Sequence, residues 1–348
     1  MRRALASIQT IDKLEPIPEA DRIELAHVLG WKVIVKKGEF QTGDKVVYVE
    51  ADSVLPEDNR FDFLRKCCYI NRFGLKGFRI KTIKMKGVIS QGIIFPITIL
   101  PDGDYPIGSD VTSTIGITKY EIPDISMPKK PRARGTFPRD IPKTDEIRVQ
   151  SIPDVLVRHA GKEFYATEKF DGTSMTVFWD SDTGLHVCSR NLDLAPDKIH
   201  AWNGSAYWHT ARKYHLDEVL HVLGDSIALQ GELIGTGIRD NKYDLKNDYK
   251  FIVFNMWDIA NRCYIDRATM EDAVKDLSLG IELVPRVYDF VLDHSVDDMV
   301  NLSKGNSILA DVPREGIVIR PWEEQFDQYL GRLSFKAINP DFLIQFDE

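Results

Sequence analysis

Hydrophobic and polar residues alternate with a period of two along several short stretches of the first 120 residues. These stretches cover residues 4–11, 23–29, 31–35, 45–49, 78–83 and 92–97. The alternation predicts strands, because successive side chains of a strand point to opposite faces. Five or six strands within about 100 residues predict a small β-barrel or sandwich, of which an OB-like barrel is one form.

The pattern changes beyond residue 121. Residues 122–142 contain five prolines and the basic run Lys-Lys-Pro-Arg-Ala-Arg, a composition typical of a linker. Strand patterns then alternate with helical ones, which we place at 206–223 and 267–277. The length of 348 residues fits two domains. We therefore expect an α+β protein made of a β-barrel at 1–121, a linker at 122–143 and a mixed α/β domain at 144–348.

The composition is that of a folded globular chain, with 43% hydrophobic and 28% charged residues. The four cysteines include the adjacent pair Cys67 and Cys68 and lack the paired spacing of zinc sites, so we expect reduced thiols. Charged residues interrupt the apolar pattern near the N-terminus, and the sequence has no run of 18 apolar residues. We therefore expect a cytoplasmic protein that is neither exported nor membrane-spanning.

Charge is unevenly distributed along the chain. The net charge of −8 combines a net +2 over residues 1–121 with a net −10 over the rest. Residues 60–86 hold nine basic side chains and one acidic one, with aromatic residues between them. This pattern is typical of nucleic-acid contacts, but a solvated loop with core aromatics explains it equally well. The candidate nucleic-acid contacts are Arg72, Lys76, Arg79 and Lys81.

One lysine stands at a strand end before a tight turn. A strand pattern leads through Glu168 to Lys169, the pair Asp171-Gly172 predicts the turn, and a second strand pattern follows. Glycine there would allow the backbone to approach a ligand closely. A lysine with a depressed pKa can attack the α-phosphate of a nucleotide. Taken alone, this segment is better explained by an exposed lysine beside a hairpin turn.

Further segments follow in a fixed order: Ser-Arg-Asn at 189–191, Gln-Gly-Glu at 230–232, a strand pattern at 251–259, Glu-Gly-Ile-Val-Ile-Arg at 315–320 and Ser-Phe-Lys-Ala-Ile-Asn at 334–339. Together with the Lys169 segment, this series resembles motifs I, Ia, III, IIIa, IV and V of the covalent nucleotidyltransferases. That superfamily includes the ATP-dependent DNA and RNA ligases and the mRNA capping enzymes. The resemblance covers residues 144–348, and the joint order is far more specific than any single motif.

Elementary chemistry suggests a role for several of these side chains. Glu232 and Glu315, each beside a glycine, could hold a hydrated divalent cation that neutralises a triphosphate, although either could also be a surface carboxylate. Lys336 and Arg190 would supply positive charge to phosphate oxygens. Trp257 offers a flat face to a purine, but a single tryptophan is more often a core residue.

The resemblance sharpens these roles. It implies an N-terminal OB-like β-barrel followed by a mixed α/β nucleotidyltransferase domain with an ATP-grasp-like ligase fold. It further implies that ATP is consumed with Mg²⁺ or Mn²⁺ and that AMP becomes attached to the lysine. The implied catalytic residues are Lys169, Lys336 and Asp171. Glu168 would recognise adenine and Trp257 would stack on it, while Arg190 and Glu232 would contact the ribose or the phosphodiester end. Glu315 and Glu232 would bind the metal.

Two positions depart from the pattern of related RNA ligases. Ile338 stands where they have a second lysine, and Ser174 stands where they have an asparagine. One cationic contact to the α-phosphate is therefore missing or replaced, and Arg148 is a candidate replacement within the nucleotide site.

The order of the two domains discriminates among the members of the superfamily. DNA ligases and capping enzymes usually carry an OB domain after the catalytic domain, whereas here the OB-like part comes first. This arrangement resembles the clade that seals 3′-hydroxyl RNA ends to 5′-phosphate ends in RNA repair. We expect a monomeric RNA ligase acting on such ends, including nicks in a duplex. A DNA ligase, a capping guanylyltransferase and a non-catalytic RNA-binding protein remain alternatives.

Overall fold

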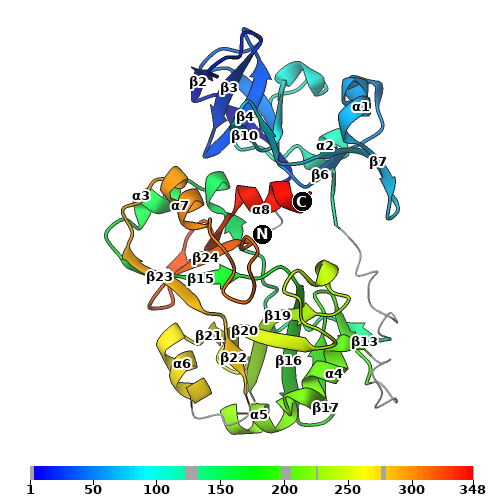
Figure 1. Cartoon of the computed structure of the whole chain (residues 1–348), viewed down its shortest axis with the longest axis vertical. Helices are drawn as coiled ribbons and strands as arrows, with labels where there is room; N and C mark the ends of the chain where they lie inside the picture. The colour runs from blue at the N-terminus through cyan, green and yellow to red at the C-terminus, as the bar shows by residue number, and fades with distance from the viewer. Residues whose placement is uncertain (1–3, 122–131, 197–204, 225, 276–279, 348) are drawn as a thin grey trace.

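The computed structural model describes residues 4–121, 132–196, 205–224, 226–275 and 280–347. Figure 1 shows a β-rich N-terminal part above a larger C-terminal part, with the last helix, α8 (Pro340–Gln345), between them. Among these residues, no helix combines the length and the apolar character needed to cross a bilayer.

The N-terminal part is built from short sheets. Their strand orders are β1-β5-β11, β2-β3-β4, β12-β6-β8-β7 and β10-β9. The strands are β1 (Ala6–Thr10), β2 (Lys13–Pro16), β3 (Ile23–Val28), β4 (Trp31–Lys36), β5 (Lys45–Val49), β6 (Ser53–Leu55), β7 (Tyr69–Arg72), β8 (Leu75–Ile80), β9 (Ile83–Met85), β10 (Val88–Ser90), β11 (Ile93–Pro96) and β12 (Thr118–Lys119). Short helical turns connect them: η1 (Asn59–Leu64), α1 (Arg65–Cys68), η2 (Ile97–Ile99) and α2 (Thr112–Ile115).

Strand β5 shows why the alternating pattern produced this fold. Val47 and Val49 pack into one apolar cluster, whereas Val46 and Tyr48 pack into another on the opposite side. Both faces of β5 are therefore buried, and the strand lies in the middle of the sheet β1-β5-β11 between two apolar clusters. The predicted N-terminal barrel is confirmed.

The C-terminal part contains two large sheets. An eight-stranded sheet has the order β13-β18-β17-β16-β19-β20-β21, with β22 also on β20, and a five-stranded sheet has the order β14-β27-β24-β15-β23. The strands are β13 (Ala133–Thr136), β14 (Ile147–Arg148), β15 (Glu163–Lys169), β16 (Thr173–Asp180), β17 (Gly184–Cys188), β18 (Leu192–Leu194), β19 (Ile227–Gly235), β20 (Tyr249–Asp258), β21 (Cys263–Tyr264), β22 (Glu282–Leu283), β23 (Arg286–Val291), β24 (Gly316–Pro321), β27 (Phe335–Ile338) and the small hairpin β25 (Phe326–Asp327) with β26 (Gly331–Arg332).

Helices lie around these sheets. They are η3 (Val149–Ser151), α3 (Asp154–Arg158), α4 (Ala206–Lys213), α5 (Leu216–Leu223), η4 (Arg239–Asn241), α6 (Arg267–Lys275), α7 (Val296–Leu302) and α8. The single helix predicted at 206–223 is two helices, because His215 takes a left-handed φ of 46° that interrupts the α-helical path.

The segment predicted as a linker is in part a strand. Residues 122–131 lie outside the described residues, but β13 pairs with β18 at the edge of the eight-stranded sheet. Phe137 and Ile141 are buried in an apolar cluster with residues of that sheet. Residues 133–141 therefore pack as part of the C-terminal sheet.

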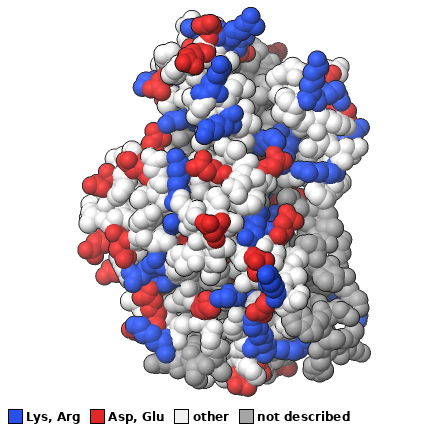
Figure 2. Space-filling model, in the orientation of Figure 1, with Lys and Arg blue, Asp and Glu red and all other residues white. Residues whose placement is uncertain are grey.

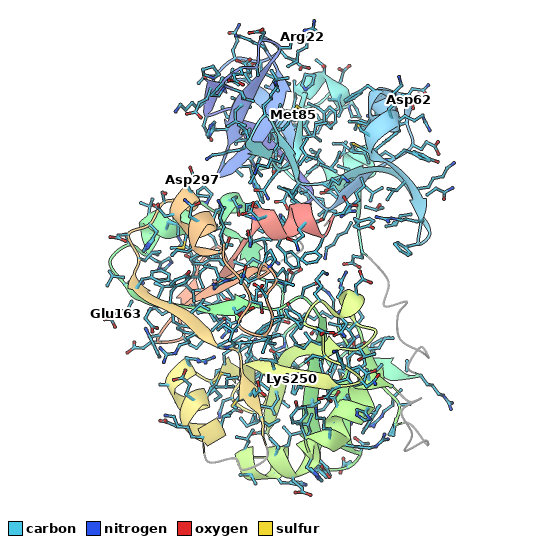
Figure 3. The ribbon with its side chains drawn as sticks, in the orientation of Figure 1. Arg22, Asp62, Met85, Glu163, Lys250 and Asp297 are labelled. Atoms are coloured by element: carbon cyan, nitrogen blue, oxygen red, sulfur yellow. The ribbon has the colours of Figure 1, made fainter. Side chains whose placement is uncertain are left out.

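The two parts contact each other directly. The Gly30 amide donates to the Gln150 carbonyl at 2.9 Å, and a β-carbon on Gly30 would lie only 2.8 Å from the Cα of Gln150. Glycine is thus required at this close approach. Lys32 of β4 pairs with Asp297 at 2.7 Å, and Figure 3 shows Asp297 where the lower part meets the barrel.

Candidate active site

The turn that carries Lys169 connects the two large sheets. Strand β15 ends at Lys169 in the five-stranded sheet, and β16 begins at Thr173 in the eight-stranded sheet. A β-carbon on Gly172 would lie 2.4 Å from the Leu233 carbonyl oxygen, so only glycine fits there. Figure 3 shows Glu163, the first residue of β15, at the left edge of the molecule, so the strand runs from the surface inward to Lys169.

A cavity of about 730 Å³ surrounds this turn, a volume large enough for a nucleotide. Most of its wall comes from the two large sheets. The N-terminal part completes it with a small group of side chains: Asp52, Phe73, Leu75, Arg79, Lys119, Tyr120 and Glu121.

Strand register explains why distant residues meet in the cavity. Thr167 lies opposite Val318, Val318 opposite Lys336, and Lys336 opposite Arg148 across four neighbouring strands. Residues paired in this way point to the same face of a sheet. The next row contains Lys169 and Ile338, which also line the cavity.

Lys169 forms an ion pair with Glu315. Its Nζ atom lies 2.6 Å from each carboxylate oxygen, and the pair is largely buried. Burial lowers the pKa of Lys169, but the charges of Glu315 and Glu232 outweigh this, so its pKa lies above the usual value. The lysine is therefore held in its protonated, non-nucleophilic form.

The two predicted metal ligands lie beside this lysine. Glu232 accepts a hydrogen bond from the Gly172 amide at 3.0 Å. Burial raises the pKa of Glu232 to about 8, and burial likewise raises that of Glu315. Buried carboxylates with too little positive charge around them are suited to bind a hard divalent cation, because such cations prefer oxygen ligands. Among the described residues, no group of three or more His, Cys, Asp or Glu side chains is arranged as a ready metal site.

The predicted phosphate contacts converge on one carboxylate. Asp145 accepts hydrogen bonds from Arg190 at 3.0 Å and from Lys336 at 3.3 Å. Burial raises the pKa of Asp145, but the charges of Lys336 and Arg190 dominate and hold it well below its usual value. Arg190 and Lys336 thus already face a common anion.

Four polar side chains lining the cavity have buried atoms without a hydrogen-bond partner among the described residues: Arg79, Tyr120, Arg148 and Glu168. Glu168 accepts from the Ile308 amide at 3.0 Å through Oε2, while its Oε1 has no partner among the described residues. Arg148 donates from Nη2 to Asp52 at 2.9 Å, while its Nε and Nη1 lack partners there. Such groups are costly unless a ligand satisfies them. A hydrogen-bond donor such as the adenine amino group fits Glu168, and a phosphate fits Arg148.

Trp257 does not line the cavity. Its indole Nε1 donates to the Asp140 carbonyl at 3.0 Å, and its ring packs edge-on against Tyr264 at 4.8 Å. Phe254 lines the cavity instead, and its carbonyl accepts from Arg320 at 2.9 Å. The expectation that Trp257 stacks on adenine therefore needs correction, because Trp257 lies farther along β20 than Phe254 and packs with Phe137 and Ile141 outside the cavity.

Three of the four candidate nucleic-acid contacts lie near one another. Arg72 and Arg79 both face the Tyr120 ring, and Arg79 and Lys81 both pair with Asp347. Arg72 is exposed, and Lys76 is exposed but paired with Glu57 at 2.6 Å. Arg79 is only 4% exposed, lines the cavity and lies 3.9 Å from the ring centre of Tyr120. Lys81 pairs with Asp347. On the face in Figure 2, basic and acidic side chains are interspersed over both parts.

Asp171 binds residues that sequence reasoning missed. Its carboxylate pairs with Lys242, and its amide donates to the Tyr243 hydroxyl at 2.7 Å. Arg239, from the same loop, lines the cavity 3.8 Å from Asp171. No motif predicts this loop, because its shape depends on left-handed residues. Sequence reasoning also missed Asp145 and Glu146, although they lie in the segment 144–148 that supplied Arg148. Glu146 forms an ion pair with Arg320.

Comparisons with known proteins agree with this geometry. A family model described as RNA ligase matches residues 162–338, and a model described as an OB-fold domain matches residues 5–97. The chain belongs to the RNA ligase family. Family membership implies an RNA substrate. A comparison with curated protein sequences finds no match.

Several solved structures are similar to this RNA ligase family member over nearly its whole length. Naegleria gruberi RNA ligase with PPi is 36% identical with a TM-score of 0.89, and the match covers 98% of each chain. A mutant of that ligase with ATP and Mn is 36% identical with a TM-score of 0.88, covering 97% of this chain and 98% of that one. A further mutant, with AMP and Mn, is 36% identical with a TM-score of 0.88, covering 98% of each chain.

Proposed function

We propose that this protein is an ATP-dependent RNA ligase that joins 3′-hydroxyl to 5′-phosphate RNA ends in RNA repair. The observation that carries the proposal is the position of Lys169, at the end of β15 in a cavity of nucleotide size, with Glu315 and Glu232 beside it. The Naegleria relatives with PPi, with ATP and Mn, and with AMP and Mn support a reaction of this type.

The chemistry consists of three displacements at phosphorus. The Lys169 Nζ, after losing a proton, attacks the α-phosphorus of ATP, and the bond to pyrophosphate breaks. A 5′-phosphate oxygen of RNA then attacks the lysine-bound phosphorus, the P–N bond breaks and the lysine regains a proton. Finally the 3′-hydroxyl oxygen attacks the 5′-phosphorus, and AMP leaves with the bridging oxygen.

The side chains of the cavity divide these tasks. Phe254 provides a face for adenine and Glu168 accepts a hydrogen bond from its amino group. Lys336, Arg190 and Arg148 bind phosphate oxygens, which positions the reacting groups and offsets their charge. Glu315 and Glu232 would hold Mg²⁺ or Mn²⁺, and the bound cation would supply charge neutralisation at the phosphates.

The proposal also names the type of RNA substrate and the cellular compartment. Because both parts of one chain line the cavity, we propose that a monomer acts on nicked duplex RNA. The four cysteines are free thiols, which fits a reducing compartment such as the cytoplasm. DNA ligation, mRNA capping and non-catalytic RNA binding stay as alternatives, the last because apolar Ile338 lines the cavity.

The test is transfer of label from α-³²P-ATP to the full chain with a divalent cation, followed by sealing of matched RNA and DNA nicks. Wild-type protein should acquire label and seal a nick with an RNA 3′-hydroxyl strand, and Lys169→Ala should do neither. Lys162→Ala is the matched control, because Lys162 precedes the same strand and its Nζ donates to Gln325 on the surface at 2.8 Å. Unlabelled wild-type protein would favour the RNA-binding alternative, and preference for a DNA 3′ strand would favour a DNA ligase.

A further inference from the structure

A strained turn lies beside the Lys169 segment. Arg239, Asp240 and Asn241 take consecutive φ values of 44°, 56° and 50°, in the left-handed region that non-glycine residues rarely adopt. Two hydrogen bonds to Leu245 hold the turn. The Asn241 side chain donates to the Leu245 carbonyl and accepts from the Leu245 amide, both at 3.1 Å. A backbone held in this way fixes the direction of the side chain that it carries.

The turn presents Arg239 to the motif I backbone. Its Nε donates to the Gly172 carbonyl at 3.4 Å, and the guanidinium lies 3.8 Å from Asp171. Asp171 has a closer, buried partner in Lys242. Neutralising Asp171 therefore does not require Arg239, whose cationic side chain also lines the cavity next to Lys169.

The neighbouring wall offers no charge at two positions. Ile338 is 3% exposed and packs with Phe342 and Leu343. Ser174 lines the cavity with a short hydroxyl. Arg239 contacts Gly172, which lies between Lys169 and Ser174 along the chain. The side chain of Arg239 is long enough to bring a positive charge to this part of the cavity, which Ile338 and Ser174 do not supply.

Exposure separates Arg239 from the deeper cations. The side chain of Arg239 is 31% exposed, compared with 12% for Lys336 and 7% for Arg148. A group near the opening meets a substrate that enters after the nucleotide has bound. We propose that Arg239 binds the 5′-phosphate of the RNA strand beside lysine-bound AMP. This inference rests on the proposed ligase function, since it assumes that RNA ends enter the same cavity.

The experiment uses the full chain with Arg239→Gln and Arg239→Lys. Glutamine can still donate to the Gly172 carbonyl but carries no charge, whereas lysine restores the charge. Binding is measured on nicked duplex RNA with either a 5′-phosphate or a 5′-hydroxyl at the nick, and AMP transfer is measured from pre-labelled protein to the phosphorylated nick. Arg262→Gln is the control, because Arg262 is exposed, pairs with Asp140 and does not line the cavity.

We expect the glutamine variant to lose the preference for a 5′-phosphate by about tenfold and to slow AMP transfer similarly, because a charged hydrogen bond is removed. The lysine variant should recover most of both, and the Arg262 control should match wild type. An unchanged preference in the glutamine variant would overturn the proposal. So would an equal loss of lysine labelling from ATP, which would assign Arg239 to the nucleotide.

The ligase function fails in a different way. If wild-type protein acquired no label from ATP, the proposed function would be wrong, whereas the phosphate preference in binding can still be measured. A wild-type preference for the 5′-phosphate that persists in the glutamine variant contradicts the Arg239 inference alone.

Discussion

Lys169 and Glu315 are 146 residues apart in sequence, yet the lysine Nζ lies 2.6 Å from both oxygens of the carboxylate. The antiparallel pairing of β15 with β24 places Lys169 opposite Gly316, so the preceding glutamate reaches the lysine. The pair keeps the lysine protonated. A nucleophilic amine requires that this contact be exchanged for another partner of Glu315.

This exchange predicts a metal-dependent defect. Glu315→Gln and Glu232→Gln should each slow lysine labelling most at low metal concentration, because a carboxylate that organises a hydrated cation matters more as the cation becomes scarce. The charge removed from Glu315 would by itself lower the pKa of Lys169 and favour attack, so a loss of rate points to the metal. The measurement is the initial rate of labelling across a Mn²⁺ titration. An equal loss at every concentration would argue for a structural or ribose-binding role.

Phe254 and Trp257 should respond differently to truncation. Phe254→Ala should weaken use of ATP by about 1 to 3 kcal/mol, the range for a base stacked on an aromatic ring, with the fold intact. Trp257→Ala should leave the KM for ATP unchanged and lower the melting temperature, since Trp257 packs with Tyr264 and donates to Asp140. Steady-state labelling and thermal unfolding of both variants decide the matter. A raised KM in the Trp257 variant alone would restore the sequence-based prediction.

Arg148 should contribute to nucleotide binding through its unpaired donors. Arg148→Lys keeps a charge near Asp52 but removes the planar guanidinium, so we expect the KM for ATP to rise by about tenfold, as for loss of a charged hydrogen bond. Asp52→Asn removes only the negative charge opposite Nη2, since the amide oxygen can still accept the hydrogen bond, and should change the KM less. A lower melting temperature with an unchanged KM in the lysine variant would show that Arg148 serves only the contact between the two parts.

The exposed cations of the barrel should act on RNA binding through salt dependence. If Arg72 contacts a phosphate, Arg72→Glu should flatten the log-log salt dependence of binding by about 0.7 to 0.9. Lys13→Glu is the control, because Lys13 is also exposed and lies on β2. Filter binding of nicked RNA over a range of salt concentrations gives both slopes. Arg79 is left out of this test, because it is buried and reversing its charge would destabilise the fold.

Asp327 should stabilise the fold at neutral pH. Burial raises its pKa, but hydrogen bonds from His159, two backbone amides and Arg158 outweigh this and hold the pKa well below its usual value. The stabilisation is therefore present above the unfolded pKa of about 4 and is lost as the pH falls toward the folded pKa. Asp327→Asn should cost about 3 kcal/mol at pH 7. Urea unfolding should show this gap shrinking at pH 3, and a gap that stays constant would exclude the charge as its cause.

Sequence reasoning located Lys169 and the two carboxylates beside it but not the residues that surround them. The ordered motifs identified all three, and strand pairing brings them together from the end of β15, the interior of β19 and the residue before β24. The choice between Phe254 and Trp257 depended on which point along β20 meets the nucleotide, and the pairing with β19 shifts register at Phe254. An apolar strand buried on both faces does not carry that information.

The Arg239 turn illustrates a different limit. Nothing in Arg-Asp-Asn-Lys-Tyr marks three left-handed residues, because these conformations are imposed by contacts with Asp171 and Leu245. The charge pattern at 60–86 was also ambiguous for a physical reason. Net charge counts side chains without their partners, and Glu57 and Asp347 meet Lys76 and Lys81 from outside that segment.

The turn after Lys169 belongs to two sheets at once. Hydrogen bonding between β15 and β24 fixes the distance from Lys169 to Glu315, whereas the distance from Lys169 to Glu232 depends on how the sheets pack. Phe170, Ile234 and Val284 belong to one apolar cluster beside this turn. Phe170 and Val284 line the cavity, whereas Ile234 lies behind it. Since packed interiors transmit volume changes of a single methylene, an exchange at Ile234 would alter catalysis without touching ATP or RNA. In an evolving lineage, this apolar position would therefore be constrained along with the charged residues that it supports.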